Sequence, residues 1–315
     1  MIDWTDRYCR QFHRVLSREA LLYTEMITAN AVIHGDRDRI LGHAGDGPVA
    51  LQLGGADPGA LGEAARIGAD QGYDEVNLNC GCPSDRVQSG AFGAVLMRDA
   101  PLVADCVAAM IAAQPLEVTV KCRIGVDDDD PREVLPRFIE TVAAAGVRRF
   151  IIHARKAWLQ GLSPKENREI PPLDHALVIG MKREFPQLSI SLNGGVQSLD
   201  EARALLEQGL DGVMIGRAAY QRPFDVLGRA DAIIWGKGAA QTRAQVVARM
   251  EPVIAAHLAQ GGRLHQFTRH MLGLFAGESG ARAWRRILSE EGGCAGAGIE
   301  VLHRALAATG ERLAA

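Results

Sequence analysis

Features typical of a membrane protein, an exported protein or a disordered chain are missing from this sequence. No run approaches the roughly 18 unbroken apolar residues that a membrane helix needs. Residues 1–6 include no basic segment followed by an apolar stretch. Apolar residues make up 47% of the 315 residues and charged residues 23%, an ordinary globular composition. We therefore expect a folded cytoplasmic protein with a substantial core.

Cysteine is too sparse for a disulfide framework. Six cysteines in a chain of 315 residues do not match the dense pattern of small secreted domains, so free thiols are expected. The pair Cys80-x-Cys82 lacks a second cysteine or histidine pair at ligand spacing, which disfavours zinc. We predict no metal site. The run 127–130 of aspartates before Pro131 fits a helix cap better than a metal site.

An excess of positive charge is also missing, but the charge is uneven. The net charge of −3 argues against a generally basic nucleic-acid binder. Residues 240–315, however, hold nine arginines and six acidic residues, a balance of +3, which leaves −6 on residues 1–239. This segment either contacts a polyanion or simply exposes solvated helix faces.

What the sequence does contain is an alternation of strand-like and helix-like segments. Seven short β-rich runs are separated by amphipathic stretches such as 57–72, 99–113, 131–146 and 198–209, several of which have capping residues at their ends. The runs are 21–26, 49–53, 75–79, 117–121, 149–153, 189–193 and 212–216. The pattern predicts an α/β fold, a (β/α)8 TIM barrel with its first strand missing from this chain. A small C-terminal helical domain follows, and we place the division between residues 1–235 and 236–315.

Polar residues close every one of these strands, at the end where a barrel of this kind carries its chemistry. A single polar residue at such a place is often only a satisfied core group, but seven in succession are hard to explain in that way. They are Glu25, Gln52, Asn77 with Asn79, Lys121, His153, Asn193 and the pair Gly216-Arg217.

The last two strand ends predict a phosphate site. Asn193-Gly194-Gly195 and Gly216-Arg217 combine backbone N–H groups that a glycine leaves accessible with the charge of an arginine. The chain has neither a strand-linked Gly-x-Gly-x-x-Gly nor a P-loop sequence, which disfavours the two commonest alternatives for binding a nucleotide. A phosphorylated ligand or cofactor is therefore expected at the barrel mouth.

Cys82 and Lys121 are the strongest candidates for chemistry. The Gly81-Cys82-Pro83 turn follows the strand at 75–79 and would fix a thiol over the mouth. A free thiol is mostly protonated at neutral pH, so it can act as a proton donor or a nucleophile. Lys121 suits either a Schiff base, as in a barrel aldolase of phosphorylated sugars, or a fixed cation beside an electron-rich cofactor.

These motifs resemble the flavin-dependent tRNA-dihydrouridine synthases over nearly the whole chain. The run Asn77-Leu78-Asn79-Cys80-Gly81-Cys82-Pro83-Ser84 is similar to the active-site signature of that family. Residues 154–168 and 280–286 resemble the subfamily that acts on D-loop uridines 20 and 20a. The resemblance implies a monomeric tRNA-processing oxidoreductase with FMN as cofactor and NADPH as reductant. A folding helper that binds tRNA without catalysis remains the alternative from another class.

The resemblance also implies roles for individual residues. Cys82 would donate a proton to uracil C5 while FMN supplies a hydride to C6, and Lys121 would balance negative charge on the flavin. Cofactor contacts are implied at Met1, Ile2, Gln52, Lys121, His153, Asn193, Gly194, Gly195, Gly216 and Arg217. Contacts with tRNA are implied at Asn79, Lys165, Arg168, Arg282 and Arg285.

The chain departs from the family pattern at one place. Members of the family carry a strand ending in Ala-Pro-Met before the segment that matches residues 2–6, whereas here the sequence starts at that Met. We expect a gap between the first and last strands of the barrel. We also expect a natural start further upstream.

Overall fold

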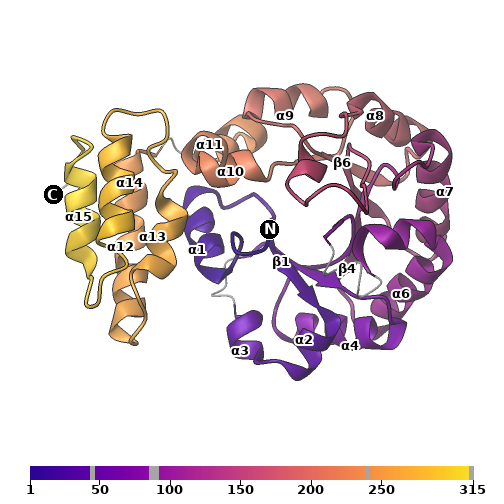
Figure 1. Cartoon of the computed structure of the whole chain (residues 1–315), viewed down its shortest axis with the longest axis horizontal. Coiled ribbons are helices and arrows are strands. Elements are labelled where there is room, and N and C mark those ends of the chain that lie inside the picture. The colour runs from indigo at the N-terminus through magenta and orange to yellow at the C-terminus, as the bar shows by residue number, and fades with distance from the viewer. Residues whose placement is uncertain (43–46, 85–91, 239–240, 312–315) are drawn as a thin grey trace.

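Seven parallel strands form one curled sheet at the centre of the computed structural model, which describes residues 1–42, 47–84, 92–238 and 241–311. The strands follow each other in sequence order, and helices surround the outside of the curl (Figure 1). They are β1 (Leu22–Thr28), β2 (Val49–Gly54), β3 (Glu75–Cys80), β4 (Glu117–Arg123), β5 (Arg149–His153), β6 (Ser189–Asn193) and β7 (Gly212–Met214). All seven predicted strands are confirmed, and so is the barrel-like α/β class.

Helices connect consecutive strands, as a parallel sheet requires. They are α2 (Ala29–His34), α3 (Arg37–Ile40), α4 (Pro58–Asp70), η1 (Gly93–Arg98), α6 (Ala100–Ala113), α7 (Pro131–Ala144), η2 (Glu166–Arg168), α8 (His175–Glu184) and α9 (Leu199–Leu206). Side chains of Asp57, Asp99, Asp130 and Ser198 cap the starts of α4, α6, α7 and α9. The cap interpretation of Asp130 is therefore confirmed.

Strands β3 and β4 place alternate residues on opposite faces. Val76, Leu78, Val118 and Val120 belong to the apolar core shared with the helices. The intervening residues 75, 77 and 79 of β3 and 117, 119 and 121 of β4 share the other face, where Asn77 pairs with Thr119 in register and Asn79 with Lys121. Along β3 and β4, the inside of the curl is therefore lined mainly with polar side chains.

The remaining helices build a second core beside the barrel. These are α1 (Arg7–Leu16), α10 (Arg217–Gln221), α11 (Pro223–Trp235), α12 (Arg243–Ala259), α13 (His265–Met271), α14 (Ala281–Glu290) and α15 (Ile299–Ala307). Phe12 of α1, Val226 of α11 and Trp284 of α14 are buried in this core. Figure 1 shows α1 between the barrel and the helices α12 to α15. The division after residue 235 falls at the end of α11 and stays a prediction. None of the described helices is long and apolar enough to cross a bilayer.

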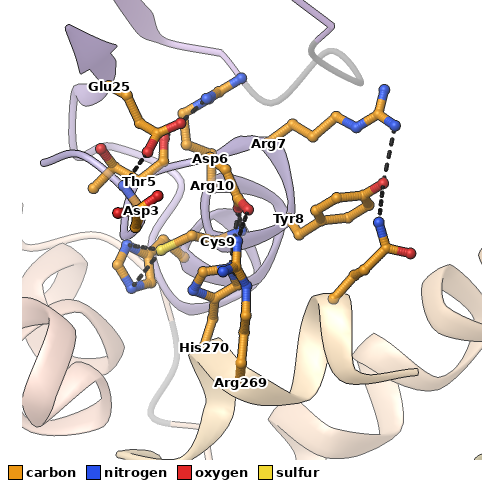
Figure 2. Close-up of polar contacts among 12 residues, drawn as sticks. Asp3, Thr5, Asp6, Arg7, Tyr8, Cys9, Arg10, Glu25, Arg269 and His270 are labelled. Carbon is orange, nitrogen blue, oxygen red and sulfur yellow. Dashed lines mark hydrogen bonds and ion pairs between the residues drawn. The ribbon is translucent and has the colours of Figure 1, made fainter. Parts of the chain in front are cut away.

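Asp6 joins the start of α1 to the helical region (Figure 2). Its carboxylate accepts a hydrogen bond from the Cys9 N–H at 2.9 Å, lies 3.1 Å from His270 Nε2 and pairs with the Arg269 guanidinium. Burial alone would raise the pKa of Asp6, but the hydrogen bonds from His270, Cys9 and Arg269 lower it to about 2. The carboxylate therefore keeps its charge, and this contact, far into acidic pH.

The first residues lie beside both edge strands of the sheet. The N–H of Asp3 donates to Glu25 of β1 (Figure 2), and the Met1 sulfur lies 3.5 Å from the position that a Cβ on Gly216, just after β7, would take. Strands β1 and β7 do not pair with each other within the described ranges. This agrees with the expected gap between the first and last strands.

Candidate active site

Cys82 lies at the carboxyl end of β3 in a turn that a single side chain holds. Asn79 Oδ1 accepts hydrogen bonds from the N–H groups of Gly81 and Cys82, both at 2.9 Å. The Cys82 thiol is partly exposed and lies 3.5 Å from Ser84 Oγ. Cys80, in contrast, is fully buried in the apolar core, and burial raises the pKa of its thiol well above the usual range. Only Cys82 of this pair is accessible to a ligand.

Gln52 and Lys121 flank Asn79 on the inner face of the sheet. Asn79 Nδ2 donates to Gln52 Oε1 at 2.9 Å, and Lys121 is the register partner of Asn79 on β4. Burial, and next the charge of Arg123, lower the pKa of Lys121 to about 8. Lys121 is therefore a cation at neutral pH that loses its charge at moderately alkaline pH.

Lys121 in the cofactor-free protein is expected to titrate near pH 8. Reductive ¹³C-methylation and NMR would follow its ammonium group as a function of pH, and Lys121→Met would assign the resonance because it removes that signal. Below pH 8 the group should be charged and above it neutral, since burial disfavours the charged form. A Lys121 signal with an ordinary lysine pKa of about 10.4 would contradict this environment.

Arg123 is a site residue that the sequence analysis missed. It is buried, its Nε donates to Gly81 O at 3.0 Å, and its Nη1 donates to Asn167 O at 3.0 Å and Lys156 O at 3.2 Å. Burial lowers its pKa to about 9. Arg123 therefore ties the Cys82 turn to the loop after β5. Its position two residues after Lys121, on the same face of β4, is the signal that could have identified it.

His153 closes β5 and is buried beside these cations. Burial, reinforced by the charges of Arg123 and Lys121, lowers the pKa of His153 well below its usual range. The imidazole is therefore neutral and can donate a hydrogen bond from one nitrogen while accepting at the other.

Two glycines after β6 form a close backbone turn. Gly194 has φ +110° and Gly195 has φ +81°, a region that favours glycine. A Cβ on Gly194 would lie 2.6 Å from His153 Cδ2, and one on Gly195 would lie 2.5 Å from Leu173 Cδ1. Asn193 Nδ2 donates to Met214 O at 2.8 Å and so holds β6 to β7. His153 and Leu173 occupy the space that a side chain would take at these two positions, so only glycine fits this turn.

Arg217 extends the same edge of the site. It forms an ion pair with Glu169 at 2.7 Å and donates from Nη2 to Arg168 O at 3.2 Å. Met1 lies against Gly216, while Ile2 is 59% exposed. The hydrogen bond from Arg217 thus places Arg168, a predicted tRNA contact, beside a predicted cofactor contact.

The other predicted tRNA contacts lie on exposed surface. Lys165 and Arg168 are exposed on the loop around η2. Arg282 and Arg285 are exposed on α14, which stands with α12, α13 and α15 beside the barrel in Figure 1. The structure therefore brings Asn79 to the thiol and Arg168 to Arg217, but it keeps the two α14 arginines in the helical region.

Comparisons with known proteins identify the family. A family model described as dihydrouridine synthase matches residues 1–308. The chain is 56% identical over 303 residues to a tRNA-dihydrouridine(20/20a) synthase of Shewanella oneidensis, covering 96% of this chain and 90% of the relative. It is 56% identical over 309 residues to the protein of the same name from Vibrio cholerae, with coverages of 98% and 94%. It is 57% identical over 308 residues to that of Escherichia coli K12, with coverages of 97% and 89%. On this similarity, which spans the barrel and the helical region alike, the chain belongs to the dihydrouridine synthase family.

Proposed function

We propose that this protein is a flavin-dependent tRNA-dihydrouridine synthase that reduces the C5–C6 double bond of D-loop uridines 20 and 20a. The observation that supports it most directly is the Cys82 thiol, held over the barrel mouth at the same end as Lys121, Gly194 and Gly195. The names of the relatives supply the substrate class. The proposal includes NADPH as reductant and a monomeric, cytoplasmic enzyme.

The residues at the mouth fit FMN as the cofactor. The Gly194-Gly195 turn after β6 carries no side chain of its own, which suits close approach of a phosphate to the backbone, and Arg217 adds a charged donor. Gln52, His153 and Asn193 would bind and orient the ring system, together with Met1 and Ile2 from the first residues. FMN bound there would supply the hydride that uracil C6 accepts.

Cys82 would complete the reduction as general acid. Transfer of its Sγ proton to C5 saturates the bond and leaves a thiolate, which takes up a proton from solvent before the next turnover. Lys121, a cation at neutral pH, would stabilise negative charge that builds up during the transfer.

Recognition of the uridine requires contacts beyond the barrel mouth. A base inside folded tRNA reaches a deep site only when it is flipped out of its stack, and the surrounding RNA must then be held. Asn79 would contact the uridine, Lys165 and Arg168 the RNA at the rim, and Arg282 and Arg285 the RNA over the helical region.

The direct test is an assay of the purified protein. Its absorbance spectrum should show a bound flavin, and with NADPH and unmodified tRNA it should produce dihydrouridine at positions 20 and 20a, detected by mass spectrometry of nuclease fragments. A protein that stays colourless after reconstitution with FMN, or that leaves both positions as uridine, would refute the proposal.

Arg282→Ala combined with Arg285→Ala is expected to weaken tRNA binding and leave flavin content unchanged. Each lost phosphate contact should reduce the salt slope of binding by about one. Filter binding over a salt series measures the effect.

The matched control removes the same charge elsewhere in the helical region. Arg286 pairs with Glu290 and Arg304 pairs with Glu291, whereas no ion pair of Arg282 or Arg285 is present in the described part of the chain. The double variant Arg286→Ala with Arg304→Ala should retain most of the affinity. Equal losses in both double variants would show a general charge effect and remove the specific role of Arg282 and Arg285.

A further inference from the structure

A line of hydrogen bonds crosses the barrel interior and ends at the turn that carries Cys82. Asn79 Nδ2 donates to Gln52 Oε1 at 2.9 Å, Gln52 Nε2 donates to Asn77 Oδ1 at 2.9 Å, and Asn77 Nδ2 donates to Thr119 Oγ1 at 2.8 Å. The Thr119 hydroxyl then donates to Glu75 Oε1 at 2.6 Å. All five side chains are at most 8% exposed.

The direction of this line is fixed at both ends. At the mouth, Asn79 Oδ1 faces the N–H groups of Gly81 and Cys82, which can only donate. The Nδ2 of Asn79 must therefore face Gln52, and the same reasoning sets the orientation of each following amide. At the far end, Glu75 also receives the Tyr23 hydroxyl at 2.8 Å and the Arg149 guanidinium at 3.0 Å. Tyr23 and Arg149 are both donors to this carboxylate, and Thr119 Oγ1 already accepts from Asn77, so Thr119 directs its own proton to Glu75.

We propose that Glu75, Thr119 and Asn77 are positioning residues for Cys82, because this one-directional chain keeps Asn79 Oδ1 facing the Gly81–Cys82 turn. A buried amide that loses its acceptor is driven to find another, and rotation of Asn77 would place like atoms against Gln52 and then Asn79. A substitution that removes a distant hydrogen bond therefore loosens the turn, although no residue of the turn itself is substituted.

The role of Cys82 as an acid rests on the proposed function. The positioning of the Gly81–Cys82 turn by the hydrogen-bond chain does not. The thiol must meet uracil C5 within about an ångström of its productive place, and misplacement of that size costs up to about a hundredfold in rate. A loosened turn should therefore lower kcat and leave KM for tRNA nearly unchanged, since none of the three residues lies on the surface that would contact RNA.

Thr119→Val tests this chain of hydrogen bonds, and Tyr23→Phe is its matched control. Each variant removes one hydroxyl donor to the same oxygen of Glu75, but only Thr119 also accepts from Asn77. In the flavin-loaded protein, NMR hydrogen exchange of the Gly81 and Cys82 amides should be about tenfold faster in Thr119→Val and nearly unchanged in Tyr23→Phe. Thr119→Ser keeps the hydroxyl and should restore the protection.

A second variant covers the case in which Thr119→Val does not fold. Asn77→Ala breaks the hydrogen-bond chain one link nearer the turn and keeps the hydrogen bond between Thr119 and Glu75. It should accelerate hydrogen exchange of the same two amides. Wild-type exchange in every folded variant that breaks the chain, or equal acceleration in Tyr23→Phe, would overturn the proposal.

The activity measurement separates this inference from the proposed function. If Thr119→Val accelerates exchange and lowers kcat for dihydrouridine formation by about tenfold at constant KM, both stand. If the exchange result holds but the wild-type protein forms no dihydrouridine, the positioning role of the hydrogen-bond chain stands and the proposed function fails. If the wild type is active and amide exchange is the same in the variants as in the wild type, the positioning role is refuted and the proposed function stands.

Discussion

Cys82→Ala is expected to lower dihydrouridine formation by about 10²- to 10⁴-fold while flavin content and tRNA affinity stay near those of the wild type. The size follows from the loss of a positioned proton donor, which leaves only water to protonate C5. The Cys82 side chain is partly exposed and its thiol makes a long contact of 3.5 Å with Ser84 Oγ, so truncation should disturb the fold little. Single-turnover reduction of tRNA, followed by mass spectrometry, measures the rate of the chemical step directly.

Two controls define what the Cys82 result means. Cys294→Ser changes an exposed thiol of the helical region and should leave the rate unchanged. Cys82→Ser keeps a hydroxyl in place of the thiol and should be slow, because a serine hydroxyl is a much weaker acid. If Cys82→Ala forms dihydrouridine at the wild-type rate, the thiol is not the proton donor.

The same variant separates the enzyme from a folding helper, and a trapping experiment separates it from an aldolase. A folding helper would bind tRNA equally well with and without Cys82 and would form no dihydrouridine in either case. A Schiff-base aldolase would depend on Lys121 and would be trapped by borohydride in the presence of its sugar phosphate. Membership of the dihydrouridine synthase family favours neither.

Much of the barrel could be predicted because its signals are local. The alternation in Glu75–Cys80 and Glu117–Arg123 reflects the two-residue period of a strand, and Asp57 and Asp130 precede prolines at helix starts. Parallel strands end at one edge, so a list of strand-end residues already groups Gln52, Lys121, His153 and Asn193 in space. The structure confirms that grouping, while the roles of these residues stay predictions.

The contacts that join distant segments could not be predicted in this way. Arg123 reaches the carbonyl of Asn167, 44 residues away, in the short helix η2 of the loop after β5. Helix α1 belongs to the core of the helical region, and Asp6 pairs with Arg269 across 263 residues. Spacing along the sequence carries no information about such partners, because the geometry of the folded chain alone brings them together.

Gly194→Ala is expected to remove bound flavin from the purified protein. A side chain at φ +110° is strained by about 1–2 kcal/mol, and here its Cβ would also lie 2.6 Å from His153 Cδ2. The turn and the imidazole must both shift, and a loss of about 2.7 kcal/mol in cofactor binding corresponds to a hundredfold rise in Kd. Titration of the cofactor-free protein with FMN, followed by flavin fluorescence, measures this change.

Gly209→Ala separates the effect on the site from general backbone strain. Gly209 has φ +99°, but a Cβ there would meet no atom within 4 Å, and the residue lies before β7 at the opposite end of the strand from the site. Its variant should lower the melting temperature through the same strain and still bind FMN with wild-type affinity. Because both variants share the unfavourable φ, a selective loss of flavin in Gly194→Ala would assign the binding role to the turn after β6. Equal FMN affinity in the two variants would show that this turn does not contact the cofactor.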